Sequence, residues 1–258
     1  DGGAESWGWH RSKIHCGTGI GWARTDNRTV GPADVGGNWE VWINSPPSEK
    51  APFDILTPDS RITQPMQPTT DGHYISYQGY NPFPVDRGIY HLSNYMDHRF
   101  NFFSTGFVGN YPDFTGKEID FIRAEAYYHM GRGDLARQIV NQYRANGDLP
   151  PFEDEQNPDS PDRCVPQLPD GSCGDLWEAL KYEKRIELYH YGFAQEYFDD
   201  RGWGDLVKGT FLELPVPGQE LLLLLQDIYT FGGEAGNGAP GGGVTPDFIV
   251  DVRPEALR

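Results

Sequence analysis

The stretch EIDFIRAEAYYHMGRGDLARQIVNQYRANGDLPP, residues 118–151, decides the fold. Asp134 is suited to cap a second helix after the turn at 131–134, and Gly147 followed by two prolines stops that helix. The pattern predicts two amphipathic helices folded back on each other, as in a tetratricopeptide-type hairpin. Apolar side chains recur at helical spacing before and after the turn, at Ile119, Ile122, Ala126 and Met130, then at Leu135, Ile139, Val140 and Tyr143.

A hairpin of this type does not bury its apolar face alone, because each repeat stacks on a neighbour. Further repeats are not evident in the 258 residues. We therefore expect something outside this polypeptide to cover the apolar surface of the hairpin. That cover is either a chain carrying the missing helices or a second copy.

Two more helices are expected downstream. Asp175 is placed to cap a long third helix that runs to about residue 200. A brief helix is expected at 219–225, after the Leu-Pro-Val-Pro segment at 214–217. The apolar stripe of the long helix uses Leu176, Leu180, Ile186, Tyr189, Phe193 and Tyr197.

Residues 1–110 carry little helical periodicity and form a loop-rich aromatic region, followed by a helical region at 111–258. Alternating pieces at 39–43 and 73–77 predict short strands. The predicted fold class is therefore mainly α: a tetratricopeptide-like helical hairpin plus a long helix, with extensive irregular loops and a few short strands.

The amino-acid composition restricts the classes of function to be considered. Only 37% of the residues are apolar, while 32 glycines and 21 prolines predict long ordered loops. Aromatic residues reach 14%, which suits an extracellular binding surface. The formal charge of −17 argues against nucleic acid and anionic membranes as partners, because both attract clustered Lys and Arg. No apolar run approaches the length of a membrane helix.

Cysteine spacing indicates the redox environment. Cys164 and Cys173 flank a Pro- and Gly-rich loop. Their spacing, with no histidine nearby, matches no common zinc-binding motif. We predict a disulfide between them, and hence an oxidising compartment, with two free thiols as the alternative. Cys16 is left over, either buried or paired outside this chain.

Four segments in order resemble the SusD/RagB family of outer-membrane nutrient-binding lipoproteins. They are PVDRGIYHLSNYMDHRF at 84–100, the 118–151 stretch, LWEALKYEKRIELYHYGFAQEYFDDRGWGDL at 176–206, and LPVPGQELLLL at 214–224. The resemblance covers about residues 52–230 and corresponds to the C-terminal half of a family member. We expect the N-terminal half and the lipid-anchor cysteine of the family to be absent here.

The resemblance implies a SusD-like fold and a location at the extracellular face of the outer membrane. It further implies non-enzymatic binding of an oligosaccharide or similar nutrient and its delivery to a TonB-dependent outer-membrane channel. One alternative is an extracellular structural or assembly subunit, in which a partner chain or self-association supplies the missing helices. A distant alternative is a glycoside hydrolase, which needs two carboxylates across a cleft.

Aromatic residues beside polar ones suggest a sugar-stacking platform, although each ring taken singly is more typical of core packing. The resemblance assigns no specific binding residue. The candidate ligand-binding residues are Trp7, Trp9, Trp39, Trp42, Tyr77 and Tyr80.

Other polar groups favour structural roles. Glu183 and Glu187 lie one helical turn apart, a spacing that an acid/base pair uses, but neither has a His or Asp partner. We interpret them as part of an Arg–Glu network that reaches Arg123 and Glu125. The acidic loop 153–175 has the oxygen ligands that Ca²⁺ prefers but lacks the EF-hand series, so a solvated loop is favoured. We predict no catalytic residue and no other metal site.

Overall fold

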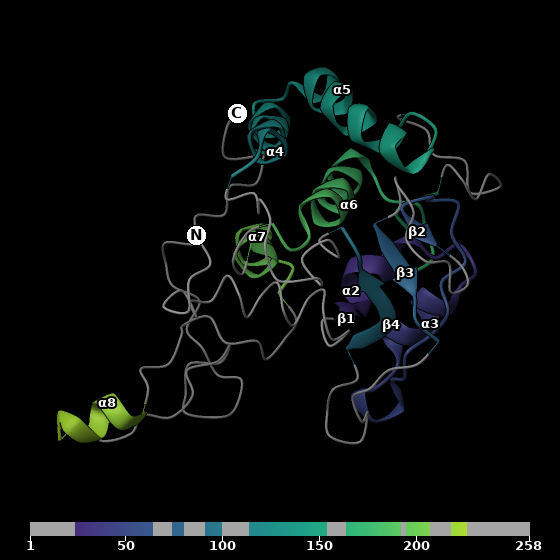
Figure 1. The fold of residues 1–258 in the computed structure, drawn as a ribbon. Coiled ribbons are helices and arrows are strands. Elements are labelled where there is room, and N and C mark those ends of the chain that lie inside the picture. The colour runs from purple at the N-terminus through teal and green to yellow at the C-terminus, as the bar shows by residue number, and fades with distance from the viewer. Residues whose placement is uncertain are drawn as a thin grey trace. The chain divides into compact units, whose positions relative to one another are not determined.

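The computed structural model describes residues 24–63, 74–79, 91–99, 114–153, 164–191, 195–206 and 218–225. The chain divides into two compact units, Asp1–Gly192 and Phe193–Arg258, so residues on both sides of position 110 share the first unit. The described residues form helices and one small four-stranded sheet (Figure 1), in agreement with a mainly helical class that contains some strands.

The predicted hairpin is present as α4 (Gly116–His129) and α5 (Gly133–Arg144). Thr115 begins α4 with a capping box: its hydroxyl accepts from the Glu118 N–H, and the Glu118 carboxylate accepts from the Thr115 N–H. Gly131 turns the chain with φ +72°, a conformation that favours glycine. Asp134 does not cap α5, because Arg132 occupies the N-cap position and α5 has no side-chain cap.

The buried face of α4 differs from the predicted one. Phe121 and Ala124 are fully buried against α5 and α6, whereas Ile119 and Ile122 are 48% and 56% exposed. Helical spacing places these two pairs on opposite faces. The predicted buried face of α4 is therefore wrong. Phe121 and Ala124 pack inward, and the stripe Ile119, Ile122, Ala126 and Met130 is exposed.

The long third helix is shorter than predicted. Asp175 caps α6 (Leu176–Leu188) as expected, with its carboxylate accepting from the Glu178 N–H. The helix ends because His190 adopts a left-handed φ of 66° and because Arg99 donates to the last carbonyl groups, those of Ile186, Glu187 and Tyr189. A cation at a helix C-terminus also favours this end electrostatically.

The sheet has the order β1-β4-β3-β2. β1 (Arg24–Asp26) and β3 (Ile75–Tyr77) run antiparallel to the central β4 (Leu92–Asp97), and β2 (Ile62–Thr63) runs parallel to β3. The prediction of a strand within 73–77 is confirmed by β3. Two short turns of helix, α2 (Asn27–Val30) and η3 (Gly31–Ala33), follow β1 directly.

The predicted strand at 39–43 is wrong, because these residues form α3 (Asn38–Asn44), which precedes the short η4 (Pro47–Glu49). The Asp34 carboxylate accepts from the Trp39 N–H at the start of α3. At the other end, Lys50 Nζ donates to the carbonyl oxygens of Trp42 and Ile43. These side-chain caps from the flanking segments outweigh the β preference of the Trp and Val side chains.

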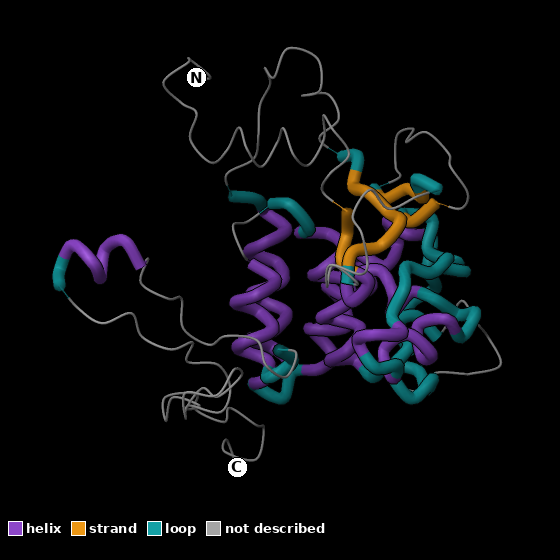
Figure 2. The backbone as a smooth tube through the Cα atoms, turned by 90° about the horizontal axis from the view of Figure 1, so that it is seen from below, coloured by secondary structure: helices purple, strands orange, loops and turns teal. Residues whose placement is uncertain are grey.

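α6 separates two hydrophobic clusters and contributes to both. Tyr182 and Ile186 face the sheet cluster, which includes Ile55, Ile75 and Tyr95. α6 also contributes to the hairpin cluster, where it packs with Phe121, Val140 and Tyr143. Its members of that cluster are Ala179, Leu180 and Leu188. Figure 2 shows the four strands gathered together beside the helices. The helix α6 therefore joins the loop-rich part of the first unit to the hairpin.

The second unit contains α7 (Gln195–Trp203) and α8 (Gly218–Leu223), and neither has a buried residue. The brief helix predicted at 219–225 corresponds to α8, and Leu222–Leu225 are 61–92% exposed. Among the described residues, no helix combines the length and apolar character needed to cross a membrane.

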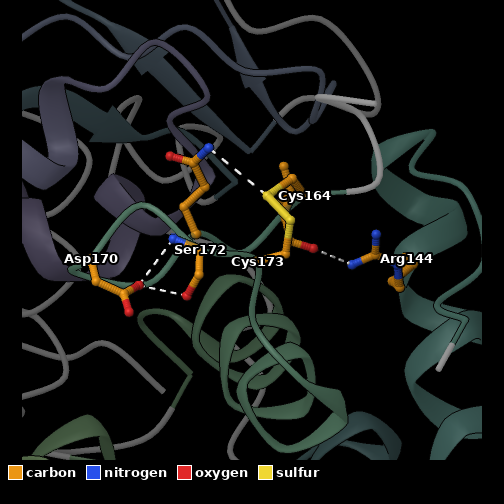
Figure 3. Close-up of a disulfide and its surroundings, with 7 residues drawn as sticks. Arg144, Cys164, Asp170, Ser172 and Cys173 are labelled. Atoms are coloured by element: carbon orange, nitrogen blue, oxygen red, sulfur yellow. Dashed lines mark hydrogen bonds between the residues drawn. A yellow bond between two sulfur atoms is a disulfide. The ribbon is translucent and has the colours of Figure 1, made fainter. Parts of the chain in front are cut away.

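The predicted disulfide is confirmed: Cys164 and Cys173 are joined, with Cα atoms 4.8 Å apart (Figure 3). Within the closed loop, Gly171 turns the chain at φ +80°, and the Asp170 carboxylate accepts from the Ser172 N–H and hydroxyl. Arg144 Nη1 donates to the Val165 carbonyl at 2.7 Å, which ties this loop to α5. Cys16 lies outside the described residues.

Candidate functional site

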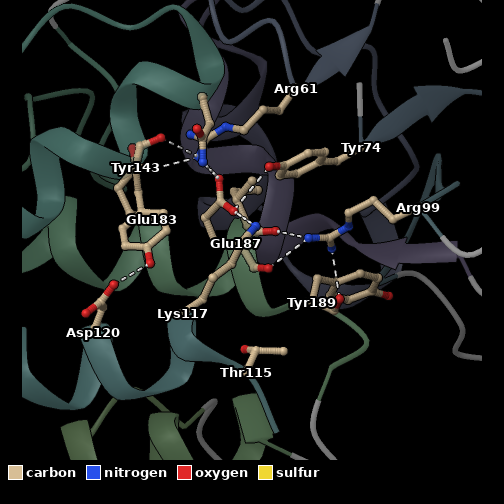
Figure 4. A network of polar contacts seen from close by, with 12 residues as sticks. Arg61, Tyr74, Arg99, Thr115, Lys117, Asp120, Tyr143, Glu183, Glu187 and Tyr189 are labelled. Carbon is tan, nitrogen blue, oxygen red and sulfur yellow. Dashed lines mark hydrogen bonds and ion pairs between the residues drawn. The ribbon is translucent and has the colours of Figure 1, made fainter. Parts of the chain in front are cut away.

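Three Asp-x-Arg turns lie at the ends of strands: Asp26/Arg28, Asp59/Arg61 and Asp97/Arg99. In each, the aspartate carboxylate accepts from the backbone N–H of the arginine and also binds its guanidinium. Such a turn fixes the direction of a long cationic side chain. In two of the three turns, the arginine is directed toward α6 (Figure 4).

Arg61 lies at the centre of a buried polar network. Its side chain and those of Asp59, Glu183 and Glu187 are all 0% exposed. Nη2 donates to Asp59 at 2.7 Å, and Nη1 donates to Glu183 at 2.7 Å and to Glu187 at 3.0 Å. The guanidinium thus joins the segment before β2 to one face of α6 (Figure 4).

Three further side chains, each from a different segment, contact the Glu187 carboxylate. Lys117 of α4 binds its Oε2, Tyr74 donates its hydroxyl to the same oxygen at 3.2 Å, and Asn146 donates to Oε1 at 3.0 Å. Every oxygen of this carboxylate is therefore used. The network connects the sheet edge, the hairpin and α6 through one side chain.

Gly147 is required where the hairpin approaches this network. A Cβ at this position would lie 2.4 Å from Asp59 Oδ1 and 2.7 Å from Arg61 Nε, closer than real side chains pack. The Gly147 carbonyl also accepts from the Ser60 N–H at 3.0 Å. The glycine that was predicted to stop the second helix therefore also makes room for the ion pair.

The carboxylates of the network differ in acidity. Burial raises the pKa of Glu183, and its cationic partners do not fully compensate. Burial is the largest single cause at Asp59 and Glu187 and acts in the same direction, but their partners together outweigh it, so the pKa of each lies below its usual value. These partners are Arg61 and Tyr182 for Asp59, and Arg61, Lys117 and Asn146 for Glu187. Asp59 and Glu187 are therefore the carboxylates whose ionised form the network favours. The cations of the network are Arg61, Arg144 and Lys117.

These shifts predict an acid-side loss of stability. A lowered folded-state pKa stabilises the protein above the unfolded value and loses that contribution as the pH falls through the folded value. With ordinary values of 3.8 for Asp59 and 4.5 for Glu187, the loss begins near pH 4.5 and continues below 3.8. Glu183, with a raised pKa, acts in the opposite direction, and its contribution is lost as the pH rises above 4.5.

Urea unfolding between pH 6 and pH 3 measures this effect. The Asp59→Asn variant has no carboxylate to protonate at this position, so its free energy of unfolding should fall less on acidification than that of the unaltered protein. Equal falls in the two proteins would show that Asp59 is not a source of the pH dependence.

The network is closed to solvent, which favours the structural interpretation of Glu183 and Glu187. Glu183 Oε1 accepts no hydrogen bond and lies 3.7 Å from Arg144 Nη1. The partner differs from the predicted one, since Arg61 takes the place expected for Arg123. Arg123 instead pairs with Asp120 on the surface of α4, and Glu125 pairs with Lys184. Two buried carboxylates held by one guanidinium are not free to exchange protons with a substrate.

Of the candidate aromatic residues that the structure describes, two stack on each other and the third packs against a different ring. Trp39 and Trp42 stack on each other with ring centres 5.8 Å apart, and each is only 4% exposed. Lys50 Nζ lies 4.1 Å from the Trp42 ring centre, which closes that side further. Both rings therefore pack in the interior and offer no open face for a sugar.

Tyr77 is half-buried in β3 and packs against Tyr95, with ring centres 5.4 Å apart. Burial, followed by a hydrogen bond to Asp54, raises the pKa of its hydroxyl. Trp7, Trp9 and Tyr80 lie outside the described residues.

A different aromatic cluster lies where α4 ends and α6 begins. Tyr128 stacks on Trp177 with ring centres 4.8 Å apart and an interplanar angle of 26°, and His129 meets the same indole at 4.9 Å. All three side chains are half-buried. We call Tyr128, His129 and Trp177 the α4–α6 cluster. Sequence inspection missed it because its members lie 49 residues apart, on two helices whose contact the sequence does not mark.

Within the described residues, no group of three His, Cys, Asp or Glu side chains is arranged to hold a metal ion. The acidic loop considered for Ca²⁺ is described at 153 and 164–175, and its residues 154–163 lie outside the description. The Ca²⁺ hypothesis for that loop therefore stays a prediction.

Comparison of the chain with protein-family models, with curated proteins and with solved structures finds no match.

Proposed function

We propose that this chain is a non-enzymatic binding protein of the SusD/RagB kind. In this proposal it binds an oligosaccharide or similar nutrient at the outer face of a Gram-negative cell. It then delivers that ligand to a TonB-dependent channel in the outer membrane.

The observation that carries the proposal is the meeting of three resembling segments on one helix. The 118–151 stretch supplies α4 and α5, the 176–206 stretch supplies α6, and the 84–100 stretch supplies β4 and Arg99. Arg99 donates to the carbonyl groups at the end of α6, and the hairpin shares a core with α6. The proposal requires such contacts, because it treats these segments as parts of one architecture.

Two further features support binding rather than turnover. The carboxylates with acid/base spacing, Glu183 and Glu187, are fully buried and bound to Arg61. A glycoside hydrolase instead needs two carboxylates that flank a scissile bond, one of them able to donate a proton. The Cys164–Cys173 disulfide is in keeping with an oxidising, extracytoplasmic location.

A glycan panel tests the proposal. The protein is run through native gels that contain individual polysaccharides, and each polysaccharide is assayed in parallel for newly formed reducing ends. We expect retardation by at least one polysaccharide, with no release of reducing ends from it. Unchanged mobility in every gel, or reducing ends released in proportion to the protein added, would contradict the proposal.

The assembly alternative has one observation in its favour. The stripe Ile119, Ile122, Ala126 and Met130 runs along the exposed side of α4. It is an unpartnered apolar face of the kind that a neighbouring helix covers. A stable interface buries roughly 800 Å² on each partner, more than one line of four side chains provides. We therefore rank assembly below binding.

A further inference from the structure

We infer that the α4–α6 cluster is a stacking platform for an uncharged pyranose unit of the ligand. This inference rests on the proposed function and deepens it, since it names the site and the chemical class of the sugar. None of the three side chains belongs to the aromatic set that the sequence suggested.

Tyr128 and Trp177 place two partly exposed aromatic rings, one stacked on the other, where two helices meet. Trp177 lies in the first turn of α6, and Tyr128 lies parallel to it in the last turn of α4. Trp177 packs partly against the hairpin cluster, and both rings are half-buried. Rigid aromatic side chains of this kind dominate binding surfaces because they bury much area with few rotatable bonds.

Two carboxylate side chains lie near the platform, at the start of α6. Asp175 is exposed at the start of α6, and Glu178 follows one turn later. Both carboxylates lie close enough to Tyr128 to add to the effect of burial, the larger cause, in raising the pKa of its hydroxyl. A few convergent polar groups beside an apolar wall are typical of small-ligand sites.

The contrast with the other tryptophans separates this cluster from core packing. Trp39 and Trp42 also stack in parallel, but each is closed to 4% exposure. The ring centres of Trp177 and Tyr128 lie closer together, and both side chains are only half-buried. Of the two stacked Trp pairs described, only this one presents ring area to solvent.

The charges favour a neutral sugar. Glu178 is paired with Lys181, and Arg132 with Asp134, so these four charges nearly cancel. Asp175 adds a negative charge at the edge of the platform, within a chain of net charge −17. A uronic acid or sulfated sugar would bring a like charge to this surface, and that juxtaposition weakens binding.

The test uses hexasaccharides of mannose and of galactose, each beside the hexasaccharide of the corresponding uronic acid. Binding is measured by titration calorimetry on the full chain. The variants are Trp177→Ala, Tyr128→Ala and Trp177→Phe, the last of which keeps the packing against the hairpin. Met130→Ala is the matched control, because it removes an exposed neighbour that is not aromatic. Circular dichroism confirms that each variant is folded.

We expect a neutral hexasaccharide to bind, its uronate counterpart to bind at least about tenfold more weakly, and both alanine variants to lose about tenfold or more in affinity. Trp177→Phe should retain most of the affinity, and Met130→Ala all of it. Binding unaffected by Trp177→Ala and Tyr128→Ala would overturn the platform and leave the proposed function standing. Equal affinity for the uronate would overturn the neutral class. If the panel polysaccharides and all the hexasaccharides fail to bind, the proposed function falls, and this inference with it.

Discussion

Replacing Arg61 with methionine is expected to lower the free energy of unfolding by about 3–5 kcal/mol, the usual cost of removing one partner from a buried ionic group. The substitution keeps most of the side-chain volume but leaves Asp59, Glu183 and Glu187 without their shared guanidinium. Three carboxylates in a closed interior then repel one another or take up protons. Urea unfolding at pH 7 measures the loss.

Arg123→Met is the matched control for this experiment. Arg123 also pairs with an aspartate, Asp120, but its side chain is 55% exposed and the pair is screened by solvent. We expect its unfolding midpoint to stay close to that of the unaltered protein. If the two variants lost similar stability, the Arg61 network would not be the structural centre described above.

Replacing Phe121 with alanine is expected to cost about 3–5 kcal/mol, the range for truncating a buried aromatic side chain. Phe121 is fully buried and stacks on Tyr143 with ring centres 4.6 Å apart. Its loss leaves a cavity between α4, α5 and α6, the three helices that share this core. Thermal and urea unfolding both report the change.

The neighbouring residue distinguishes the observed helix face from the one that the sequence suggested. Ile122 is 56% exposed, so Ile122→Ala should change stability by no more than about 0.5 kcal/mol. A large loss for Ile122→Ala with a small loss for Phe121→Ala would mean that α4 is turned the other way. It would also place the stripe of four apolar residues in the interior.

Local signals predicted the hairpin well. Each signal for the hairpin acts over a few residues, so it can be recognised in the sequence. These signals are the glycines at 131 and 133, the stop at Gly147 and the apolar spacing of α5. The choice of buried face on α4 is different, because both faces carry apolar side chains. The positions of α5 and α6 decide that Phe121 and Ala124 pack inward.

Contacts from residues outside the elements themselves account for the other errors. α6 ends at Leu188 because Arg99, about 90 residues earlier, binds its last carbonyl groups. α3 is helical because Asp34 and Lys50 cap its two ends. The Asp-x-Arg spacing at the strand ends is the one sequence signal that would have pointed to Arg61 and Arg99. No spacing in the sequence brings Tyr128 to Trp177.

The most direct test of a binding role is the fate of a bound glycan. The neutral hexasaccharide that binds most tightly is titrated to saturation on the full chain, and the mixture is then denatured and the sugar recovered for mass spectrometry. We predict a saturable heat of binding and recovery of the hexasaccharide at its original length. Shortened products, or the absence of saturable binding across the panel, would contradict a protein that holds a sugar without cleaving it.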